Sequence, residues 1–203
     1  MQINYSKPQD AGEDEDISLR EALIRAMYDL ASVAVSAVVV VLLVFVFGFR
    51  MVGVLQRSML PTLQEGQSLI VTAFMPKVKQ HDIVIITEPS EREPLVKRVI
   101  ALGGQTIKID FEAGNIWVDG DLQDEPFIRE AITTKCIENF PLNIDTYVGE
   151  MKIPEDSVFV MGDNRNDSHD SRGIGPIRKE YLLGKVLFRV KPFGDWNVYE
   201  TTP

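Results

Sequence analysis

Residues 31–49, ASVAVSAVVVVLLVFVFGF, decide how this 203-residue chain folds. The stretch carries no charge, and Ser32 and Ser36 are its only polar side chains. As a helix rising about 1.5 Å per residue, it would span the hydrocarbon thickness of a bilayer. The soluble alternative is a buried core helix or, since eight of the residues are valine, two buried strands. The run has neither a polar face nor a turn signal, so it predicts a transmembrane helix.

A cleavable signal peptide is a second alternative for the same run. Such a peptide has a shorter apolar region near its start, directly after a basic segment. Here thirty residues precede the run, and they hold seven acidic but only three basic side chains. The residues at its end, Gly48-Phe49-Arg50-Met51, lack the small-x-small pattern of a cleavage site. The run is therefore predicted to be a retained anchor.

The residues before the anchor divide into a tail and the start of a helix. Residues 1–17 are polar, acidic and too poor in apolar side chains to fold alone, which predicts a flexible tail. Ser18, with Glu21 three residues later, matches a capping box, and apolar residues follow at helical spacing. We therefore expect one helix over residues 18–50 that contains the anchor.

The orientation of the anchor is only weakly encoded. Three basic residues precede it, whereas Arg50 and Arg57 follow it closely. Positive side chains are enriched on the cytoplasmic side, and acidic ones contribute little to this rule. The count favours a cytoplasmic N-terminus.

Residues 51–203 are long enough for one compact domain, and their pattern is typical of β-structure. Asp119-Gly120-Asp121 has the sequence of a hairpin turn, and no amphipathic helix of useful length is predicted. Short β-branched segments bounded by turn residues predict strands at residues 68–73, 82–87, 106–111, 115–118, 157–161 and 185–190. The predicted fold class is therefore mainly β, behind an N-terminal transmembrane helix.

Composition excludes several classes of function. A net charge of −9 without a basic stripe argues against a nucleic-acid partner. Cys136 is the only cysteine, so no intramolecular disulfide can form, and with two histidines it is too little for a zinc site. The sequence lacks a GxxxxGK(S/T) loop, a GxGxxG after a strand and a GxSxG elbow that could serve His81 or His169. We expect neither a metal nor a cofactor.

Three polar clusters interrupt the β-rich part, at residues 56–62 (QRSMLPT), 96–100 (VKRVI) and 162–172 (GDNRNDSHDSR). In them the chain resembles the type I signal peptidases, membrane-anchored serine proteases that remove signal peptides from exported proteins. Three such blocks in this order after a membrane span make the resemblance specific. It is carried by Ser58-Met59, Pro61-Thr62-Leu63, Asp82-Ile83-Val84, Lys97-Arg98-Val99, Gly162-Asp163-Asn164-Arg165, Ser168 and Asp170-Ser171-Arg172, with lesser matches at Val118-Asp119-Gly120, Glu125-Pro126 and residues 173–176.

The resemblance implies a Ser–Lys mechanism. Ser58 would attack the scissile carbonyl to form an acyl-enzyme, with Lys97 as general base and then general acid. Physical chemistry agrees, because a serine hydroxyl is a weak nucleophile without a base. A lysine can act as that base when burial among apolar neighbours lowers its pKa, and Ser–Lys pairs are a known variant of the triad. Val96, Val99 and Ile100 supply such neighbours, although strand alternation turns only some of them the same way.

The resemblance also implies supporting residues. Ser168 would hydrogen bond and orient the lysine, and Asp170 with Arg172 would form an ion pair that supports the site. A tight polar turn that satisfies its own backbone is the alternative for residues 163–165. The other supporting side chains, expected around the catalytic pair, are Met59, Arg98, Asp163, Asn164 and Arg165.

Gln56 and Arg57 depart from the family pattern, which has a small residue or serine and then often glycine before the catalytic serine. Acyl transfer needs hydrogen-bond donors aimed at the developing oxyanion. The backbone N–H of Ser58 is one donor, and the Gln56 carboxamide could be the second. The alternative, which stays open, is that Gln56 points to solvent and the backbone acts alone. His81 and Ala101 replace glycines of the family pattern, at a cost only in local turn geometry.

The family's properties complete the expectation. Relatives in the endoplasmic reticulum carry histidine where this chain has Lys97, so the resemblance implies an enzyme of the bacterial or organellar type. It also implies an enzyme anchored in the plasma membrane, with its catalytic domain outside the cytoplasm. The implied fold is all-β, with linked antiparallel sheets. The substrate would lie extended along a strand edge, with small residues at the first and third positions before the cut. Its partners would be signal-peptide-bearing preproteins and the lipid bilayer, and we expect a monomer.

Two other functions remain open. A Ser–Lys protease of narrower specificity would process a few secreted proteins. A self-cleaving repressor of this type is disfavoured by the membrane span and by the lack of a basic DNA-reading segment. A catalytically silent, membrane-anchored binding protein would be expected to have lost Ser58 or Lys97, and both are present.

Overall fold

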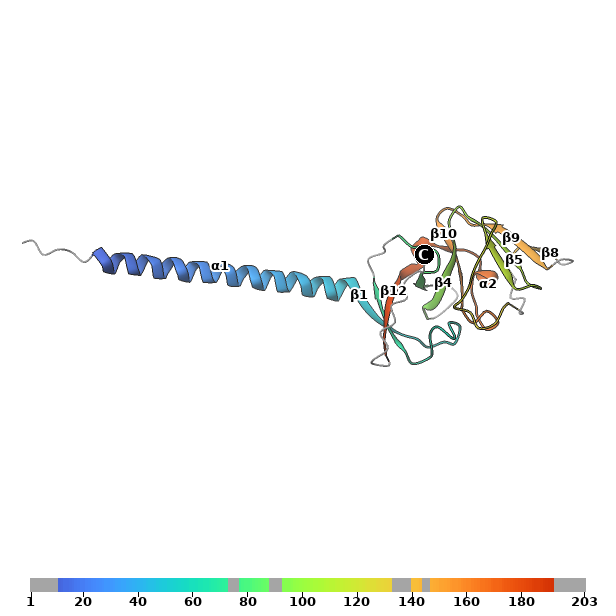
Figure 1. Cartoon of the computed structure of the whole chain (residues 1–203), viewed down its shortest axis with the longest axis horizontal. Coiled ribbons are helices and arrows are strands. Elements are labelled where there is room, and N and C mark those ends of the chain that lie inside the picture. The colour runs from blue at the N-terminus through green and yellow to red at the C-terminus, as the bar shows by residue number, and fades with distance from the viewer. Residues whose placement is uncertain (1–10, 73–76, 88–92, 133–139, 144–146, 192–203) are drawn as a thin grey trace, which may run out of the picture. The chain divides into compact units, whose positions relative to one another are not determined.

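The computed structural model of the protein describes residues 11–72, 77–87, 93–132, 140–143 and 147–191 (Figure 1). The chain divides into two units, residues 1–46 and 47–203. The first unit contains most of helix α1, and the second contains the β-strands. Cys136, the only cysteine, lies outside the described residues.

Helix α1 extends without a break over Ala11–Gly48 (Figure 1). Its stretch Leu19–Gly48 is long and apolar enough to cross a membrane, and side chains such as Val41 and Phe47 are 53% and 69% exposed. Apolar surface of this extent is unfavourable in water and is matched by the hydrocarbon of a bilayer. The helix is consistent with the predicted single-pass anchor.

Both ends of α1 differ from the prediction. The helix begins at Ala11, so Ser18 lies inside it and does not cap it. Residues 11–17 are rich in Glu and Asp, whose negative charge is favourable in the first turns of a helix, where the helix dipole is positive. The helix ends at Gly48 rather than at residue 50, because Phe49 and Arg50 already pair with a strand of the second unit.

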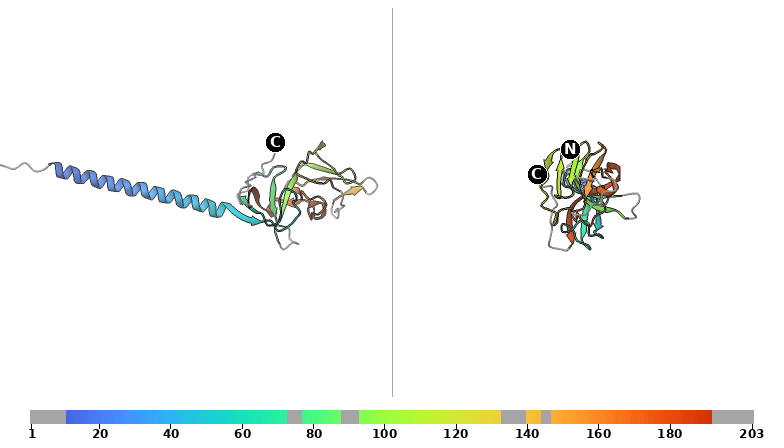
Figure 2. Two further views of the ribbon diagram at one scale, coloured as in Figure 1. Left: turned by 60° about the horizontal axis from the view of Figure 1, so that its bottom comes forward. Right: turned by 90° about the vertical axis from the view of Figure 1, so that its right-hand side faces the viewer.

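Two antiparallel sheets form the second unit, and their strands can be followed by colour in Figures 1 and 2. This architecture confirms the predicted mainly β fold. The seven-stranded sheet has the order β1-β2-β12-β3-β4-β10-β11, and the five-stranded sheet has the order β7-β6-β5-β9-β8. The strands are β1 Phe49–Gly53, β2 Ser68–Thr72, β3 Ile83–Ile86, β4 Leu95–Leu102, β5 Thr106–Asp110, β6 Asn115–Val118, β7 Asp121–Leu122, β8 Leu142–Asn143, β9 Val148–Lys152, β10 Ser157–Met161, β11 Ile177–Arg178 and β12 Leu182–Lys191, with short helices α2 Ser171–Ile174 and η1 Lys179–Tyr181.

Each of the six predicted strand segments coincides with a strand, namely β2, β3, β5, β6, β10 and β12, although β12 begins three residues before the predicted segment. The predicted hairpin is also confirmed, because Val118 pairs with Asp121 across Asp119-Gly120. Positive φ angles of 52° and 92° at Asp119 and Gly120 are those of a type I′ turn, which matches the twist of the flanking strands. The sequence does not predict β1, β4 or β9.

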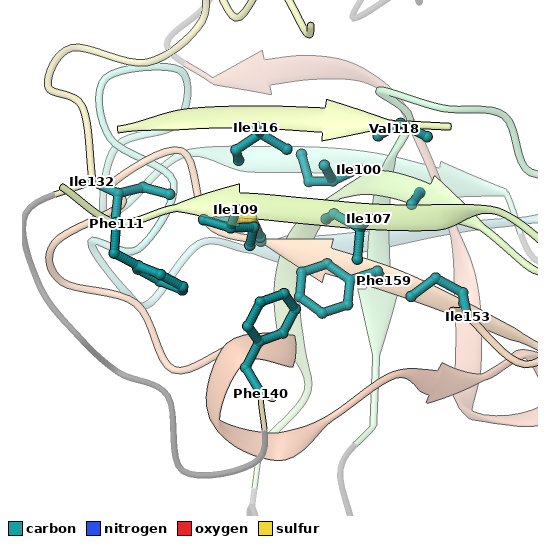
Figure 3. Close-up of a cluster of buried hydrophobic side chains, with 12 residues drawn as sticks. Ile100, Ile107, Ile109, Phe111, Ile116, Val118, Ile132, Phe140, Ile153 and Phe159 are labelled. Carbon is teal, nitrogen blue, oxygen red and sulfur yellow. The ribbon is translucent and has the colours of Figure 1, made fainter. Parts of the chain in front are cut away.

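The two sheets share an apolar core (Figure 3). Ile100 and Phe159 enter it from the seven-stranded sheet, and Ile107 and Ile109 enter it from the five-stranded sheet; all four are fully buried. Phe140 packs edge-on against Phe159, with ring centroids 5.7 Å apart. Each such side chain contributes about 1.5–3 kcal/mol when buried, so this core joins the two sheets firmly.

Strand β4 lies where three apolar clusters meet. Val96 packs against the cluster of Met59 and Leu63, Val99 belongs to a second cluster, and Ile100 belongs to the core between the sheets. Successive side chains of a strand point to opposite faces. Lys97 and Arg98 of β4 therefore point to opposite faces of the sheet. The strand is thereby held rigidly on both sides.

Candidate active site

Ser58 lies in a turn between β1 and β2 and is 6% exposed. The turn is closed by a hydrogen bond from the backbone N–H of Leu60 to the carbonyl of Arg57, 3.1 Å long. A second bond, 2.8 Å long, joins the N–H of Leu63 to the carbonyl of Met59. Met59 and Leu63 are fully buried, so the segment around Ser58 is anchored by apolar side chains that flank the hydroxyl.

Lys97 comes from the middle of β4, where it pairs with Val84 of β3, and it is 1% exposed. Its Nζ lies 2.7 Å from Oγ of Ser58, within hydrogen-bond distance. The two residues that the sequence analysis proposed as base and nucleophile, 39 residues apart in sequence, are thus brought into direct contact.

The turn after β10 is hydrogen bonded to the segment that carries Ser58. The backbone N–H of Asn164 donates to the carbonyl oxygen of Ser58 at 3.0 Å, and Nδ2 of Asn164 donates to the carbonyl of Arg57 at 3.3 Å. Oγ1 of Thr62 donates to Oδ2 of Asp163 at 2.5 Å. The alternative of a self-contained polar turn at residues 163–165 therefore does not describe this site, since its side chains bond to the nucleophile segment.

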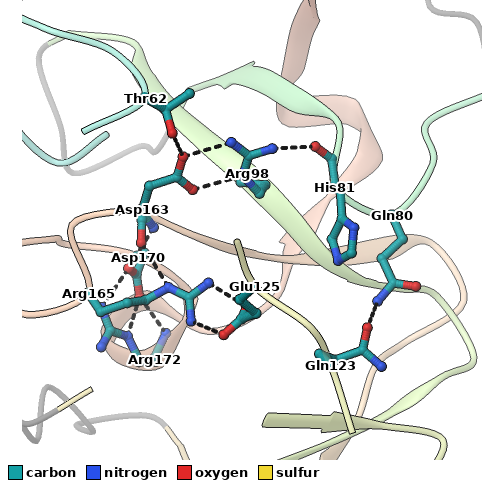
Figure 4. Close-up of polar contacts among 11 residues, drawn as sticks. Thr62, Gln80, His81, Arg98, Gln123, Glu125, Asp163, Arg165, Asp170 and Arg172 are labelled. Carbon is teal, nitrogen blue, oxygen red and sulfur yellow. Dashed lines mark hydrogen bonds and ion pairs between the residues drawn. The ribbon is translucent and has the colours of Figure 1, made fainter. Parts of the chain in front are cut away.

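Asp163 and Arg98 form a buried ion pair (Figure 4). Nε and Nη2 of Arg98 donate to the two carboxylate oxygens at 2.8 Å and 2.7 Å, and Nη1 donates to the carbonyl of His81 at 2.9 Å. Arg98 directly follows Lys97 in β4. The ion pair therefore ties the turn that carries Asn164 to the strand that carries Lys97.

Gly162 is where the turn comes closest to Ser58. Its N–H donates to Oδ2 of Asp170 at 3.0 Å. A Cβ at this position would overlap both the carbonyl oxygen of Ser58 and the side chain of Ser168. Position 162 therefore requires glycine, because the Ser58 carbonyl and the Ser168 side chain leave no room for a Cβ. In the sequence, Gly162 is marked only as the first residue of the Gly162-Asp163-Asn164-Arg165 block.

Asp170 and Arg172 form the ion pair that the sequence analysis proposed for them (Figure 4). Both side chains are buried, and Nε and Nη2 of Arg172 each donate to the carboxylate at 2.8 Å. Burial by itself would raise the pKa of the Asp170 carboxyl, but hydrogen bonding and charge from Arg172 hold that pKa below its ordinary value. Asp170 therefore stays ionised and also caps α2 by accepting from the Arg172 N–H.

Ser168 lies beside Gly162 and is 9% exposed. Its hydroxyl hydrogen bonds to the Asp170 carboxylate and helps to hold the pKa of that carboxyl below its ordinary value. The bond expected between Ser168 and Lys97 stays a prediction.

Arg165 and Glu125 form a further buried ion pair that the sequence indicated only through the Glu125-Pro126 match. Two nitrogens of Arg165 bond the carboxylate at 2.5 Å and 2.6 Å, and Nε donates to the carbonyl of Gly162 at 3.1 Å. The ring of Phe127 lies 3.9 Å from the guanidinium carbon of Arg98, a stacking contact that no sequence signal announced. These contacts tie the turn to the segment of Glu125 and Phe127.

His81 borders this network and explains one departure from the family pattern. Its backbone φ of 68° lies in the left-handed region that favours glycine. Burial, with the nearby charge of Arg98, lowers the pKa of the imidazole. Its ring contacts Phe127 and lies apart from the Ser58–Lys97 pair, with its backbone carbonyl serving Arg98 instead.

A cleft of about 420 Å³ opens beside Ser58. One wall is residues 51–56, which comprise the end of β1 and the chain after it, and the other is Glu93, Pro94 and Val96 at the start of β4. Gln56 is exposed on the first wall, with no hydrogen bond to another residue of the described chain. The nucleophile therefore borders a cleft lined mainly by apolar residues.

Among the described residues, no set of three or more His, Cys, Asp or Glu side chains is arranged to hold a metal ion. A buried lysine amine in contact with a serine hydroxyl, beside an open cleft, is the arrangement expected of a hydrolase of the Ser–Lys class.

Comparison with known proteins gives the family. The model of the signal peptidases, peptidase S26, matches residues 27–191, and the chain belongs to this family. It is 33% identical to a signal peptidase I of Bacillus licheniformis over 174 residues, covering 84% of this chain and 91% of the relative. It is 34% identical to a signal peptidase I of Bacillus caldolyticus, covering 77% and 87%. A solved signal peptidase I from Enterococcus faecalis V583 matches with a TM-score of 0.42 and 25% identity, over 55% of this chain and 97% of that one.

The close approach at Gly162 gives the first prediction. In Gly162→Ala, the new methyl group must push away the Ser58 carbonyl or the Ser168 side chain, because neither position leaves room for it. A displacement of about 1 Å at a reacting group costs about 10²-fold in rate, so peptide turnover should fall by about that factor. Gly173→Ala is the matched control, since its nearest neighbour would be at an ordinary 3.8 Å. Near wild-type turnover by Gly162→Ala would contradict this account of the turn.

Proposed function

We propose that this protein is a membrane-anchored signal peptidase I that cleaves the signal peptides of exported preproteins. The single observation that carries the proposal is the contact between two buried side chains, the Lys97 amine 2.7 Å from the Ser58 hydroxyl. Family membership supports the substrate class. The intact pair gives no support to the alternative of a catalytically silent binding protein.

The reaction follows from the geometry. Neutral Lys97 accepts the hydroxyl proton of Ser58 as the oxygen attacks the carbonyl before the cut. The tetrahedral intermediate collapses when Lys97 returns the proton to the leaving amine, which breaks the peptide bond and leaves an acyl-enzyme on Ser58. A water molecule then gives a proton to Lys97 and attacks the ester. The same proton returns to Oγ of Ser58, and the signal peptide leaves as a free acid.

Ser168 is proposed to position the lysine. Its buried hydroxyl lies beside Gly162, the residue whose missing side chain lets the turn approach Ser58. Hydrogen bonds at catalytic sites often tighten only when substrate is bound. Ser168 would then accept from or donate to the Lys97 amine as the lysine changes its protonation state, while the pair of Asp170 and Arg172 holds the backbone of this region.

The cleft supports an extended substrate. β1 is an edge strand of the seven-stranded sheet, so one side of its backbone can pair with an added strand. The cleft between β1 and β4 is lined by Gly53, Val54 and Val96, apolar residues with short side chains. Such walls suit small residues at the first and third positions before the cut, whose side chains point the same way in an extended peptide.

The chain is proposed to cross the plasma membrane once, through the apolar part of α1. The N-terminus would lie in the cytoplasm and the β-unit outside, where exported preproteins emerge. The counts of basic residues on the two sides of the anchor support this orientation. We expect the protein to act as a monomer, since the catalytic side chains described here all come from one chain.

A test of the Ser–Lys pair uses the full chain in detergent with a panel of preproteins. Ser58→Ala should abolish cleavage. Lys97→Arg should be nearly inactive because a guanidinium stays charged and cannot accept the proton. In the wild type, burial penalises the ammonium form, so we expect a pKa for Lys97 below its ordinary value of about 10.4 and a rate that rises with pH as the amine loses its proton.

Lys108→Arg, at an exposed position of β5, is the control for the arginine substitution. Near wild-type turnover by Lys97→Arg would overturn the Ser–Lys assignment. Failure of the wild type to cleave any preprotein at its signal-peptide junction, judged by the mass of the products, would overturn the proposed function. Cleavage of only a few panel members would indicate the narrower processing protease.

We propose the Gln56 carboxamide as the second oxyanion donor, beside the N–H of Ser58. It lines the cleft next to the nucleophile and is free to reach a bound carbonyl. Gln56→Ala should then lower kcat by about 10²–10³ with little change in KM, as loss of one such donor does. Gln56→Ser should restore part of the rate. Gln64→Ala, at an exposed glutamine outside the cleft, is the control, and a Gln56→Ala rate within about twofold of wild type would make Gln56 a bystander.

The orientation is tested in spheroplasts that express the chain with an N-terminal tag. Added protease should digest the β-unit and spare the tag, which should become accessible only after detergent permeabilises the membrane. Protection of the β-unit in intact spheroplasts would reverse the proposed topology.

A further inference from the structure

Among the residues that the structure describes, the cleft beside Ser58 is lined by one charged side chain. Its walls are formed by residues 51–56, Ser58, Met59, Glu93, Pro94 and Val96, and of these only Glu93 is ionisable near neutral pH. It lies just before β4, on the wall opposite β1. A peptide that fills the cleft must therefore pass this carboxylate.

Glu93 also differs from several other carboxylates of the β-unit in having no partner among the described residues. The buried side chains of Asp163, Glu125 and Asp170 are each paired with an arginine, and exposed Glu65 lies 3.6 Å from Arg57. Within the described residues, no hydrogen bond or ion pair engages the exposed side chain of Glu93. No described neighbour pairs with its charge, which therefore acts on a peptide in the cleft.

We propose that Glu93 is a specificity-determining residue that selects substrates by charge. It favours a basic residue, and disfavours an acidic one, in the part of the signal peptide that lies against it. This inference rests on the proposed function. It adds an electrostatic criterion to the small residues expected at the cut, because the other described residues that line the cleft carry no charge.

The spacing of Glu93 from the catalytic lysine indicates which substrate positions it senses. Glu93 lies four positions before Lys97, which corresponds to about 13 Å of extended chain at about 3.3 Å per residue. An extended peptide lying along this wall from Ser58 reaches the carboxylate after about four residues. The fourth and fifth positions before the cut are therefore the ones that Glu93 should sense.

The size of the effect follows from exposure. Contact between exposed opposite charges is weakened by water and by salt, and such pairs are worth little compared with buried ones. We expect a preference of about twofold to fivefold in kcat/KM at low ionic strength. The preference should shrink strongly near 1 M salt, where the Debye length falls to about 3 Å.

The test uses the full chain in detergent and preproteins that differ only in Lys, Gln or Glu at the fourth or fifth position before the cut. The wild type should cleave the Lys substrate about twofold to fivefold more efficiently than the Glu substrate. Glu93→Gln should bring this ratio close to one, and Glu93→Lys should invert it. Glu150→Lys, on β9 of the other sheet, makes the same change in net charge and should leave the wild-type ratio in place.

The outcomes separate the two proposals. A wild-type ratio of one at both positions, or a ratio that Glu93→Lys leaves unchanged, would overturn the role of Glu93 even if every substrate is cut at its junction. A ratio that Glu150→Lys shifts as much as Glu93→Lys would assign the preference to net charge and also overturn it. Failure of the wild type to cleave the Gln substrate would instead count against the proposed function.

Discussion

The buried ion pair between Arg98 and Asp163 is the interaction on which the candidate site depends. Asp163 accepts from Thr62, and the next residue, Asn164, donates its N–H to the carbonyl of Ser58. Arg98 adjoins Lys97 in β4. One carboxylate–guanidinium contact thus sets the distance between nucleophile and base. Removing either partner would leave an uncompensated buried charge, which is far more costly than the loss of a surface pair.

The burial of so many charges is made possible by the packing of β4. Three apolar clusters meet along this strand, and the core between the two sheets draws on its second half. Hydrophobic burial on this scale offsets the desolvation of Lys97 and of the arginines behind it. Arg98, Arg165 and Arg172 are each paired with a carboxylate, whereas Lys97 contacts the Ser58 hydroxyl. The side chain proposed to transfer the proton is therefore the buried amine of Lys97.

The sequence predicts local features well and distant contacts poorly. The apolar run of α1 and the Asp119-Gly120 hairpin follow from residues that are neighbours in the chain, so pattern and turn chemistry suffice for them. Strand alternation is predicted only around Lys97, and the full extent of β4 escapes prediction because Lys97 and Arg98 are buried inside it, against the usual polar and apolar alternation. The pair of Arg165 with Glu125, 40 residues apart, and the approach of Gly162 to Ser58 exist only after the sheets pack. Resemblance to a family could point to Ser58 and Lys97, but their contact is a product of tertiary structure.

Lys97 and Arg98 are neighbours in one strand, so peptidase activity requires that β4 pairs in the correct register. The register of β4 against β3 and β10 decides which of the two cations meets the serine. A slip of one residue would turn the strand over and offer a guanidinium, which keeps its charge and takes no proton. A mispaired molecule would therefore be inert rather than an unregulated protease. A protease that loses its activity when β4 is mispaired cannot cleave polypeptides indiscriminately, which protects the cell that makes it.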